Sequence, residues 1–372
     1  MDGTPYYLVD LNTFRNNCID IMHAFIEEWG ENLLFGYSVK TNHYKGLIEY
    51  AYNELGWYIE TVSSDEYKYC RGLQINPSRM ILNGPCKGTI MYSALLEGSY
   101  INLDNLDEVR DLCEHINLTN NIRVGLRVNF DLEHVCPGET TAGNRVSRFG
   151  IDCCSGDFEN AINLLSQHGL KRIGLHMHTS TKTRSIAVFR ALSSQAVNLI
   201  NKYNIDLSFI DIGGGFFGGR VVDGKPSMKA YAENICSILK TGIIPSKTTL
   251  ILEPGAAVLA TCVSYVTKVT NIRKIRNISV VTLDGTLLHI NPFMVERQQP
   301  FTMNIENDRA LVDMQILGGC TCMENDRFGE LKHMAELKVG DELKFKNAGA
   351  YTMALNSQFI IEPPSIRLLT NV

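Results

Sequence analysis

Between residues 33 and 255, eight short apolar runs alternate with longer stretches that have helical periodicity. The apolar runs are LLFGYSVK (33–40), GWYIETV (56–62), RMILNGP (79–85), SYINLDN (99–105), IRVGLRVNF (122–130), RIGLHMH (172–178), LSFIDIGGG (207–215) and TLILEPG (249–255). Between them, segments such as 46–55 and 186–203 predict helices. Strands that alternate with helices form parallel βα units, and eight such units predict a (β/α)8 barrel. The runs are apolar on both faces, as expected of strands covered by helices.

The sequence pattern changes after residue 255. Segments such as ISVVTLDG, ALVDMQILGG and ELKFKNAG are rich in β-forming residues and are separated by turn residues. We therefore expect two domains: the barrel over residues 11–255, and an antiparallel β-domain over residues 256–372. Residues 1–10, which contain the strand-like PYYLVD, are expected to join the β-domain.

Composition excludes several classes of function. The net charge is −5 and no run of like charges occurs, so nothing indicates binding to nucleic acid or to an anionic membrane. No apolar run has the length of a transmembrane helix, and the first ten residues lack a signal-like pattern, so we expect a cytoplasmic protein. The eleven cysteines do not have zinc-site spacing; we expect free thiols and no metal site.

Polar residues collect at the ends of the predicted strands, where barrel enzymes carry their chemistry. These residues are Lys40, Glu60, His176, His178, Asp211, Gly213–Gly215 and Glu253. Each has an ordinary structural explanation, because strand-end histidines are often satisfied in the core and glycine runs often form tight turns. Five such strand ends on one face of a barrel indicate a site.

The chemical types of these residues fit one cofactor. A lysine amine can form a Schiff base, and a glycine-rich loop lets backbone N–H groups approach a phosphate. A carboxylate can keep a pyridine nitrogen protonated, which makes the ring an electron sink, and an imidazole can stack on the ring. The sequence therefore predicts a site for pyridoxal 5′-phosphate (PLP).

The ordered motifs of the barrel resemble those of the alanine-racemase-fold (fold type III) PLP-dependent decarboxylases, which include the ornithine and diaminopimelate decarboxylases. The motifs are YSVKTN, GLHMHTST, DIGGGF and EPG. The resemblance implies that Lys40 carries the Schiff base, that His178 stacks on the ring and that Glu253 faces the pyridine nitrogen. It places the cofactor phosphate near Thr181 and at the loop of Gly213, Gly214 and Gly215, and it adds Gly255 to the cofactor-binding residues.

The β-domain carries further matching segments. GGCTCMEND resembles the catalytic cysteine segment of the family, with Cys322 in the reactive position. NAGAYTMALNSQF places Tyr351 at the phosphate, and TLDGT places Asp284 near the distal end of the substrate. SRFGID, a match of lower specificity, adds Arg148 as a substrate-binding candidate. Because the cysteine segment of the family reaches across a dimer interface, the resemblance implies a homodimer with shared active sites.

Three positions depart from the pattern of the family. Relatives carry an arginine directly after EPG, where this chain has Ala256. The residue after the cysteine is usually acidic, but here it is Met323, followed by Glu324. Diaminopimelate decarboxylases place an arginine where this chain has Asn291. Since Met323, Glu324 and Asn291 would bind the substrate, we expect a larger or modified amino acid instead of meso-diaminopimelate or ornithine.

The segment 131–150 interrupts the barrel pattern. It could shape substrate specificity, or it could be an ordinary surface loop; the sequence favours neither interpretation.

These observations predict a PLP-dependent decarboxylase of an L-amino acid, either a diamino acid or a modified amino acid. Lys40 would form the Schiff base, and Cys322 would protonate Cα across the dimer interface. One alternative is an amino acid racemase of the same fold, although racemases of this group set an arginine against the pyridine nitrogen where this chain has Glu253. A second is a catalytically inactive PLP-binding homologue, which Ala256 and Met323 would suit.

Overall fold

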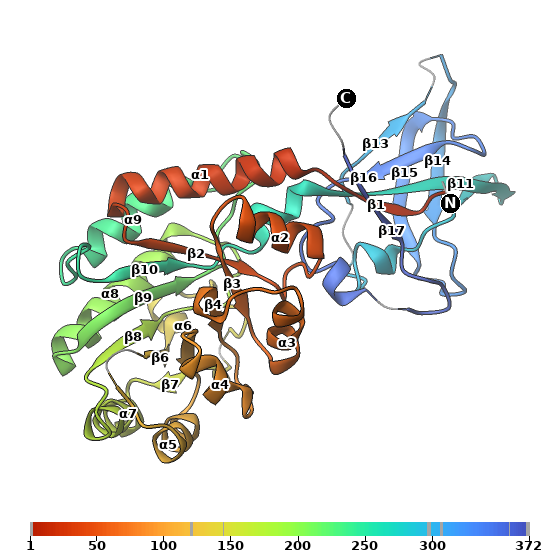
Figure 1. Cartoon of the computed structure of the whole chain (residues 1–372). Helices are drawn as coiled ribbons and strands as arrows, with labels where there is room; N and C mark the ends of the chain where they lie inside the picture. Colours follow the sequence, from red (N-terminus) through yellow and green to blue (C-terminus); the bar gives the residue numbers. More distant parts are fainter. Residues whose placement is uncertain are drawn as a thin grey trace. The chain divides into compact units, whose positions relative to one another are not determined.

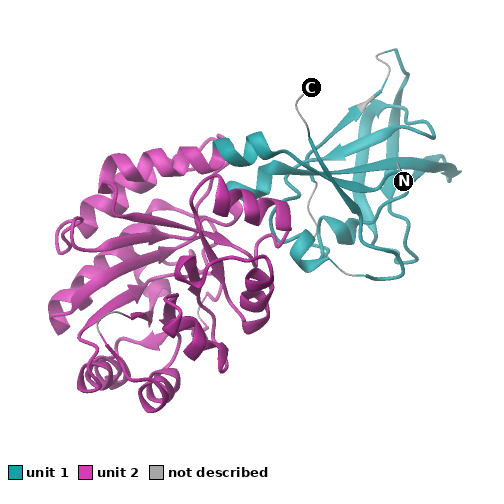
Figure 2. Ribbon diagram, viewed as in Figure 1, with its two compact units in different colours: residues 1–16, 258–372 teal, residues 17–257 magenta. Residues whose placement is uncertain are grey.

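The chain forms two compact units (Figure 2). The computed structural model describes residues 3–119, 122–143, 145–295, 299–305, 308–356 and 358–369. The barrel unit comprises residues 17–257, and the β-unit comprises residues 1–16 and 258–372.

The barrel unit is a closed parallel barrel of eight strands. In barrel order they are β2 (Leu33–Ser38), β3 (Tyr58–Thr61), β4 (Met80–Leu82), β5 (Tyr100–Leu103), β6 (Arg123–Asn129), β8 (Arg172–His176), β9 (Asp206–Gly213) and β10 (Thr249–Leu252). Pairing of β10 with β2 and of β5 with β6 closes the ring. The two-residue strand β7 (Ile151–Asp152) pairs with the end of β6. The predicted barrel is confirmed, and each of its strands falls within or next to a predicted apolar run.

Helices surround the barrel strands (Figure 1). They are α1 (Leu11–Trp29), α2 (Lys45–Asn53), α3 (Ser64–Gly72), α4 (Ile90–Leu96), α5 (Leu106–His115), α6 (Leu132–Val135), α7 (Gly156–Gln167), α8 (Ile186–Tyr203), α9 (Met228–Leu239) and α10 (Ala256–Leu259). A 3-10 turn, Pro77–Arg79, precedes β4. Among the described residues, no helix combines the length and the apolar character needed to cross a membrane.

The barrel core is organised around one aromatic ring. Phe209 of β9 is buried and packs edge-on against Tyr100 of β5, with ring centroids 5.0 Å apart. A Cβ atom at Gly174 or Gly125 would lie 2.2 or 2.8 Å from the Phe209 ring. The glycines in β8 and β6 therefore make the space that this ring fills, because interiors leave little room for an added methyl group.

The β-unit contains an eight-stranded sheet. Its strands are β1 (Tyr6–Val9), β11 (Val263–Ile275), β12 (Ile278–Leu283), β13 (Phe301–Asn304), β14 (Leu311–Gly318), β15 (Arg327–Ala335), β16 (Glu342–Phe345) and β17 (Ser365–Leu368). They follow the order β13-β16-β11-β12-β14-β15, and β1 pairs with β11 and β17. Three short 3-10 turns complete the unit: Ala260–Cys262, Leu287–His289 and Met353–Leu355.

The sheet of the β-unit is mainly antiparallel, as expected, but it also contains two parallel pairs. The pairs β12–β14 and β1–β17 are parallel, whereas the other pairs are antiparallel. Parallel pairing needs a long connection, and residues 284–310 supply one between β12 and β14. The thirteen-residue β11 holds the sheet together, because its first part pairs with β1 and β16 and its last part with β12.

Candidate active site

Lys40 and Glu60 meet at the carboxyl ends of β2 and β3. The register pairs Ser38 with Glu60, so the lysine two residues after Ser38 reaches over the neighbouring strand end. The Lys40 Nζ atom lies 2.6 Å from both Oε1 and Oε2 of Glu60. The Glu60 side chain is fully buried, whereas 30% of the Lys40 side chain is exposed. The amine is therefore held by a buried carboxylate while it remains accessible at the end of the barrel.

Two asparagine side chains extend this pair into a branched network of hydrogen bonds. Asn83 follows β4, and its Nδ2 donates to Glu60 Oε1 at 3.1 Å and to Glu253 Oε1 at 2.6 Å. Asn102 of β5 donates to Asn83 Oδ1 and to Asp211 Oδ2, each at 2.9 Å. Six strand ends, those of β2, β3, β4, β5, β9 and β10, therefore share one network. Sequence analysis noted Glu60 and Asp211 without giving them roles and missed both asparagines.

Glu253 and Asp211 form a buried acidic pair. Burial raises the pKa of Glu253 well above its usual range, and the negative charges of Asp211 and Glu60 raise it further. Burial also raises the pKa of Asp211. Two buried carboxyl groups this close do not both ionise readily, so the pair retains a proton near neutral pH. Such a pair can both accept and supply a proton at the bottom of the site.

His176 faces this acidic pair from β8. Its Nε2 atom lies 3.8 Å from Glu253 Oε2, and both side chains are only 2% exposed. Burial and the positive charge of Arg127 lower the pKa of His176 well below its usual range. Neither ring nitrogen has a hydrogen-bond partner among the described residues. Since buried polar atoms normally have partners, these nitrogens point to a bonded ligand or water.

His178 lies against the glycine-rich loop. Its Nδ1 atom accepts the backbone N–H of Gly214 at 3.2 Å, which fixes the neutral tautomer with the proton on Nε2. Its ring lies nearly parallel to that of His176, 6.0 Å away. Although part of its surface faces the cavity described below, desolvation and the positive charge of Arg127 lower its pKa well below the usual range.

The glycines of the site allow close backbone approach. Gly213 has φ +70°, and a Cβ atom there would lie 2.4 Å from the Cβ of His178. A Cβ atom on Gly214 would lie 2.3 Å from the carbonyl oxygen of Glu253. At Gly255 the nearest atom would be Thr41 Oγ1, at 2.4 Å. Only glycine fits at these three positions, because each added methyl group would overlap a neighbouring loop.

Arg127 of β6 supports His178 and was missed by sequence analysis. Its guanidinium donates to Asp104 Oδ1 at 3.1 Å and to the carbonyl oxygen of His178 at 3.4 Å. Lys87, whose side chain is fully buried, lies 2.6 Å from Glu108, and Glu108 in turn accepts the N–H of Asp104. The only sequence signal for this network is the presence of charged residues inside or directly after apolar runs.

A cavity of about 1000 Å³ opens beside His178. Its walls come from the end of β6, from described residues between 131 and 149, and from Thr179 and Ser180. The guanidinium of Arg148 lies 4.1 Å from the centre of the Phe149 ring. The 131–150 insertion thus lines a cavity and is more than a surface loop. Lys182 N–H donates to Glu139 O at 2.7 Å, and Thr140 forms an isolated bridge with Thr181, so the insertion is tied to the loop after β8.

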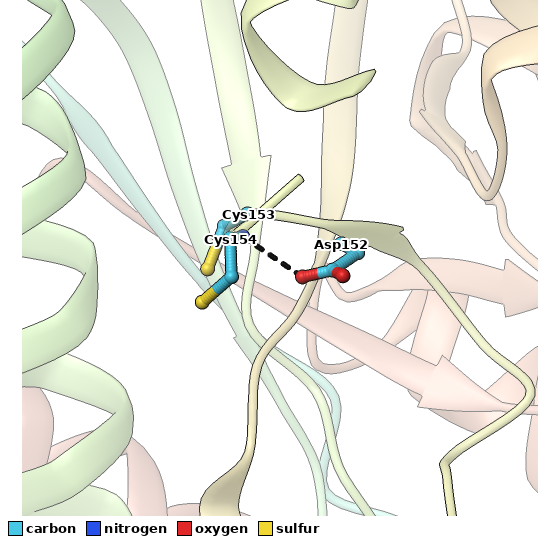
Figure 3. Close-up of side chains that lie close together, drawn as sticks. All are labelled: Asp152, Cys153 and Cys154. Atoms are coloured by element: carbon cyan, nitrogen blue, oxygen red, sulfur yellow. Dashed lines mark hydrogen bonds between the residues drawn. The ribbon is translucent and has the colours of Figure 1, made fainter. Parts of the chain in front are cut away.

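Asp152, Cys153 and Cys154 lie together at the edge of this region (Figure 3). The Cys154 N–H donates to Asp152 Oδ1 at 2.8 Å, which closes a turn before α7. Burial raises the pKa of Cys153 to about 11. A thiol with this pKa is protonated at neutral pH and is a poor metal ligand, since metals bind the thiolate. The arrangement therefore fits a structural turn.

The other predicted residues lie in the β-unit. Cys322 is exposed in a turn held by buried Asp326, whose carboxylate accepts the Thr321 N–H at 3.1 Å and the Leu287 N–H at 2.7 Å. Met323 follows in this turn, and Glu324 pairs with Arg327. Asp326 was missed by sequence analysis, where it is one of several acidic residues near the cysteine.

The remaining three β-unit residues are locally bonded or exposed. Asp284 accepts hydrogen bonds from Thr267 Oγ1 at 2.6 Å, from Lys268 N–H and from Thr4. Asn291 is buried, and its amide is bonded to the backbone of Val295. Tyr351 is exposed, with φ +57°.

Comparison with known proteins gives one family for most of the chain. The family model described as pyridoxal-dependent decarboxylase, pyridoxal binding domain, matches residues 12–260. The diaminopimelate decarboxylase of Aquifex aeolicus is 24% identical over 377 residues, which cover 99% of this chain and 86% of that protein.

Solved structures show the same fold. The diaminopimelate decarboxylase of Helicobacter pylori, complexed with L-lysine, has a TM-score of 0.80 at 20% identity. The match covers 100% of this chain and 92% of the Helicobacter pylori chain. The arginine decarboxylase of Paramecium bursaria Chlorella virus also has a TM-score of 0.80, at 18% identity, with coverage of 99% and 96%.

Proposed function

Because the chain belongs to the family of pyridoxal-dependent decarboxylases, we propose that it removes the α-carboxyl group of an L-amino acid with PLP as cofactor. The observation that carries this proposal is the chain of hydrogen bonds that joins Lys40, through Glu60 and Asn83, to Glu253. An amine that can bind an aldehyde and an acid that can face a pyridine nitrogen are thereby fixed at one end of the barrel.

The residues present fit PLP. A Cβ atom on Gly215 would meet no atom nearer than 3.9 Å, so the loop is open on that side, and Thr181 Oγ1 is buried without a partner among the described residues. Lys40 would hold the aldehyde end, His178 the ring face and Glu253 the ring nitrogen. The phosphate would lie at Thr181, Gly213–Gly215 and Gly255, with Tyr351 as a further ligand. When bound, PLP supplies the electron sink for the charge left at Cα when CO2 departs.

The side chains of the chain would orient groups and hold protons. Glu60 fixes the Lys40 amine, and Arg127 fixes the backbone of His178. The Glu253–Asp211 pair keeps a proton at the ring nitrogen, since burial opposes the ionisation of both groups. We assign delivery of the final proton at Cα to Cys322, with Lys40 as the second candidate acid. Glu253 favours decarboxylation over racemisation, because a protonated ring delocalises the charge at Cα.

We propose a diamino acid or a modified amino acid as substrate. The cavity of about 1000 Å³ is at the upper end of the range for small-molecule sites and has room for a long or substituted side chain. Arg148 at its wall is the proposed contact within the barrel unit, and Asp284, Asn291, Met323 and Glu324 are those proposed from the β-unit. The relatives named above act on different amino acids, so likeness alone selects no substrate.

We also propose a homodimer in which Cys322 of one protomer serves the barrel of its partner. Support comes from the exposure of Cys322 in a turn fixed by Asp326. Such shared sites make two protomers interdependent.

The deciding experiment measures CO2 release from a panel of L-amino acids by the purified protein loaded with PLP. We expect release from at least one diamino or modified amino acid, and no release from Lys40→Ala. Chiral chromatography of the remaining substrate distinguishes racemisation from decarboxylation. A protein that binds PLP at Lys40 but releases no CO2 from any member of a broad panel would contradict the proposal and favour the inactive homologue.

A further inference from the structure

We propose that Arg184 supplies the positive charge that binds the phosphate of PLP in this chain. This inference rests on the proposed function, because it assumes PLP at Lys40. A phosphate monoester carries between one and two negative charges at neutral pH and is bound best where a cation meets backbone N–H groups. Ala256, after Glu253-Pro254-Gly255, offers no such charge.

The loop that contains Arg184 lies along the glycine-rich loop. At one end, Gly213 lies against His178, and a Cβ atom on Gly215 would be 3.9 Å from the carbonyl oxygen of Thr179. At the other end, the Arg184 guanidinium donates to the carbonyl oxygen of Phe216 at 3.4 Å. These contacts place the cation beside the loop whose backbone would surround the phosphate.

Several hydrogen-bond donors in these two loops have no acceptor among the described residues. The hydroxyl groups of Thr181 and Ser185 are buried and unpartnered. The Ser185 side chain does not cap α8, an 18-residue helix that begins at the next residue. The backbone N–H groups of Gly215 and Phe216 also lack an acceptor within the described chain. Unpartnered donors and a helix N-terminus together form an anion site.

The backbone of Arg184 is held in an unusual conformation. Its φ of +61° lies in the left-handed region, which is uncommon for residues other than glycine. The Tyr231 hydroxyl accepts the Phe217 N–H at 3.2 Å and donates to the carbonyl oxygen of Arg184. One buried tyrosine thus fixes Arg184 to the glycine-rich loop. Strained residues that the surrounding structure fixes in this way are concentrated at ligand sites.

Other cations near the two loops are less suited to this role. Lys182, Arg220 and Lys225 are exposed, whereas Arg184 is half-buried. Within the described residues, only one of the five N–H donors of Arg184 is used, by Phe216. The planar guanidinium can bind two phosphate oxygens at once, which an ammonium group cannot do.

The test compares two probes, PLP and pyridoxal, which lacks the phosphate. Each is titrated into protein freed of cofactor, and binding is followed by absorbance and fluorescence. We expect Arg184→Gln to weaken PLP binding by ~10- to 100-fold, as for loss of a charged hydrogen bond, and to leave pyridoxal binding within about twofold. The PLP affinity of Arg184→Lys should lie between that of Arg184→Gln and that of the wild type. The matched control is Arg190→Gln, an exposed arginine on α8 bonded to Asn234, which should change neither affinity.

The other possible results of these titrations decide whether Arg184 binds the phosphate. Equal losses of PLP and pyridoxal affinity would assign Arg184 a structural role and overturn the inference, as would unchanged PLP affinity. If Arg184→Gln does not fold, as judged by its thermal unfolding, Arg184→Lys must still weaken PLP binding more than pyridoxal binding. A wild-type chain that binds neither probe would overturn the proposed function itself, and the inference with it.

Discussion

The Nζ atom of Lys40 lies 2.6 Å from both carboxylate oxygens of Glu60. The two residues stand at the ends of adjacent parallel strands, and the carboxylate is fully buried. A buried carboxylate that loses its cation is destabilised, so each residue depends on the other. The pair sets the position of the amine before any ligand arrives.

Replacing Glu60 by Gln should therefore reduce activity more than stability. The amide keeps the shape of the side chain, but it no longer attracts the Lys40 amine. We expect kcat to fall by ~10- to 100-fold, the size of a lost charged hydrogen bond, while the protein still binds PLP. Steady-state kinetics and a PLP titration check this, with Lys45→Gln on the exposed surface of α2 as control. Unchanged kcat would mean that Glu60 does not position the amine.

Replacing Asp211 by Asn should flatten the pH dependence of stability in cofactor-free protein. Burial raises the pKa of Asp211 from an ordinary 3.8 to about 7. Between these pH values the folded state holds a proton that the unfolded state has lost. The free energy of unfolding contributed by this group is thus fully present below pH 3.8 and is lost as the pH rises to about 7.

The measurement is urea unfolding of wild type and Asp211→Asn between about pH 5 and pH 8. His176 and His178 act in the opposite direction, because their depressed pKa values favour the folded state above pH 6.5. These histidines are present in both proteins, so the difference between the two curves isolates the carboxyl group. Parallel curves would show that Asp211 ionises normally in the folded state.

Gly214→Ala should destabilise the fold, because the added Cβ atom would lie 2.3 Å from a backbone oxygen. Overpacking of this kind costs about 1–3 kcal/mol. Gly72→Ala is the matched control: this glycine ends α3 and has no atom within 4 Å of the added carbon, so a small gain in stability is expected. Thermal unfolding of both variants suffices. Equal stability of the two would contradict the close approach at Gly214.

Mixing two inactive variants should restore activity if sites are shared between protomers. Lys40→Ala and Cys322→Ala each remove one of the two proposed reactive groups. In a randomly mixed population, half of the dimers are hybrids with one complete site each, which gives ~25% of wild-type activity for a two-fold dimer. The variants are co-refolded and CO2 release is measured. No recovery, with dimers present by light scattering, would mean that each site belongs to a single chain.

The sequence predicted the barrel because the evidence is local. Each strand is an apolar run of a few residues, and Lys40, His178 and Glu253 were proposed as site residues because they stand at or near the ends of such runs. Asn83 and Asn102 could not be found in this way. An asparagine before a glycine or between apolar residues also fits a turn or a strand edge. Whether its side chain reaches Asp211 depends on how the sheet closes, which local patterns do not encode.

Because local patterns do not encode which strands pair, the sheet order of the β-unit was not predicted. β-forming residues separated by turn residues predicted strands but not their partners, so the parallel pairing of β12 with β14 was missed. Arg127 and Lys87 were missed for a related reason, because an isolated charge in an apolar run gives no information about its counter-charge. In both cases the deciding contact lies many residues away in sequence.

The asparagine bridge has a consequence for how this chain can change over evolutionary time. Asn83 donates to two carboxylates and accepts from Asn102, so any new side chain there removes a hydrogen bond from groups on three other strands. The stability changes caused by substitutions within such a set are not additive. A tolerated replacement at one position therefore requires matched replacements at the others. A replacement at Asn83 is therefore expected only together with matched replacements at its bonded partners, whereas the described residues of the 131–150 insertion share none of these hydrogen bonds.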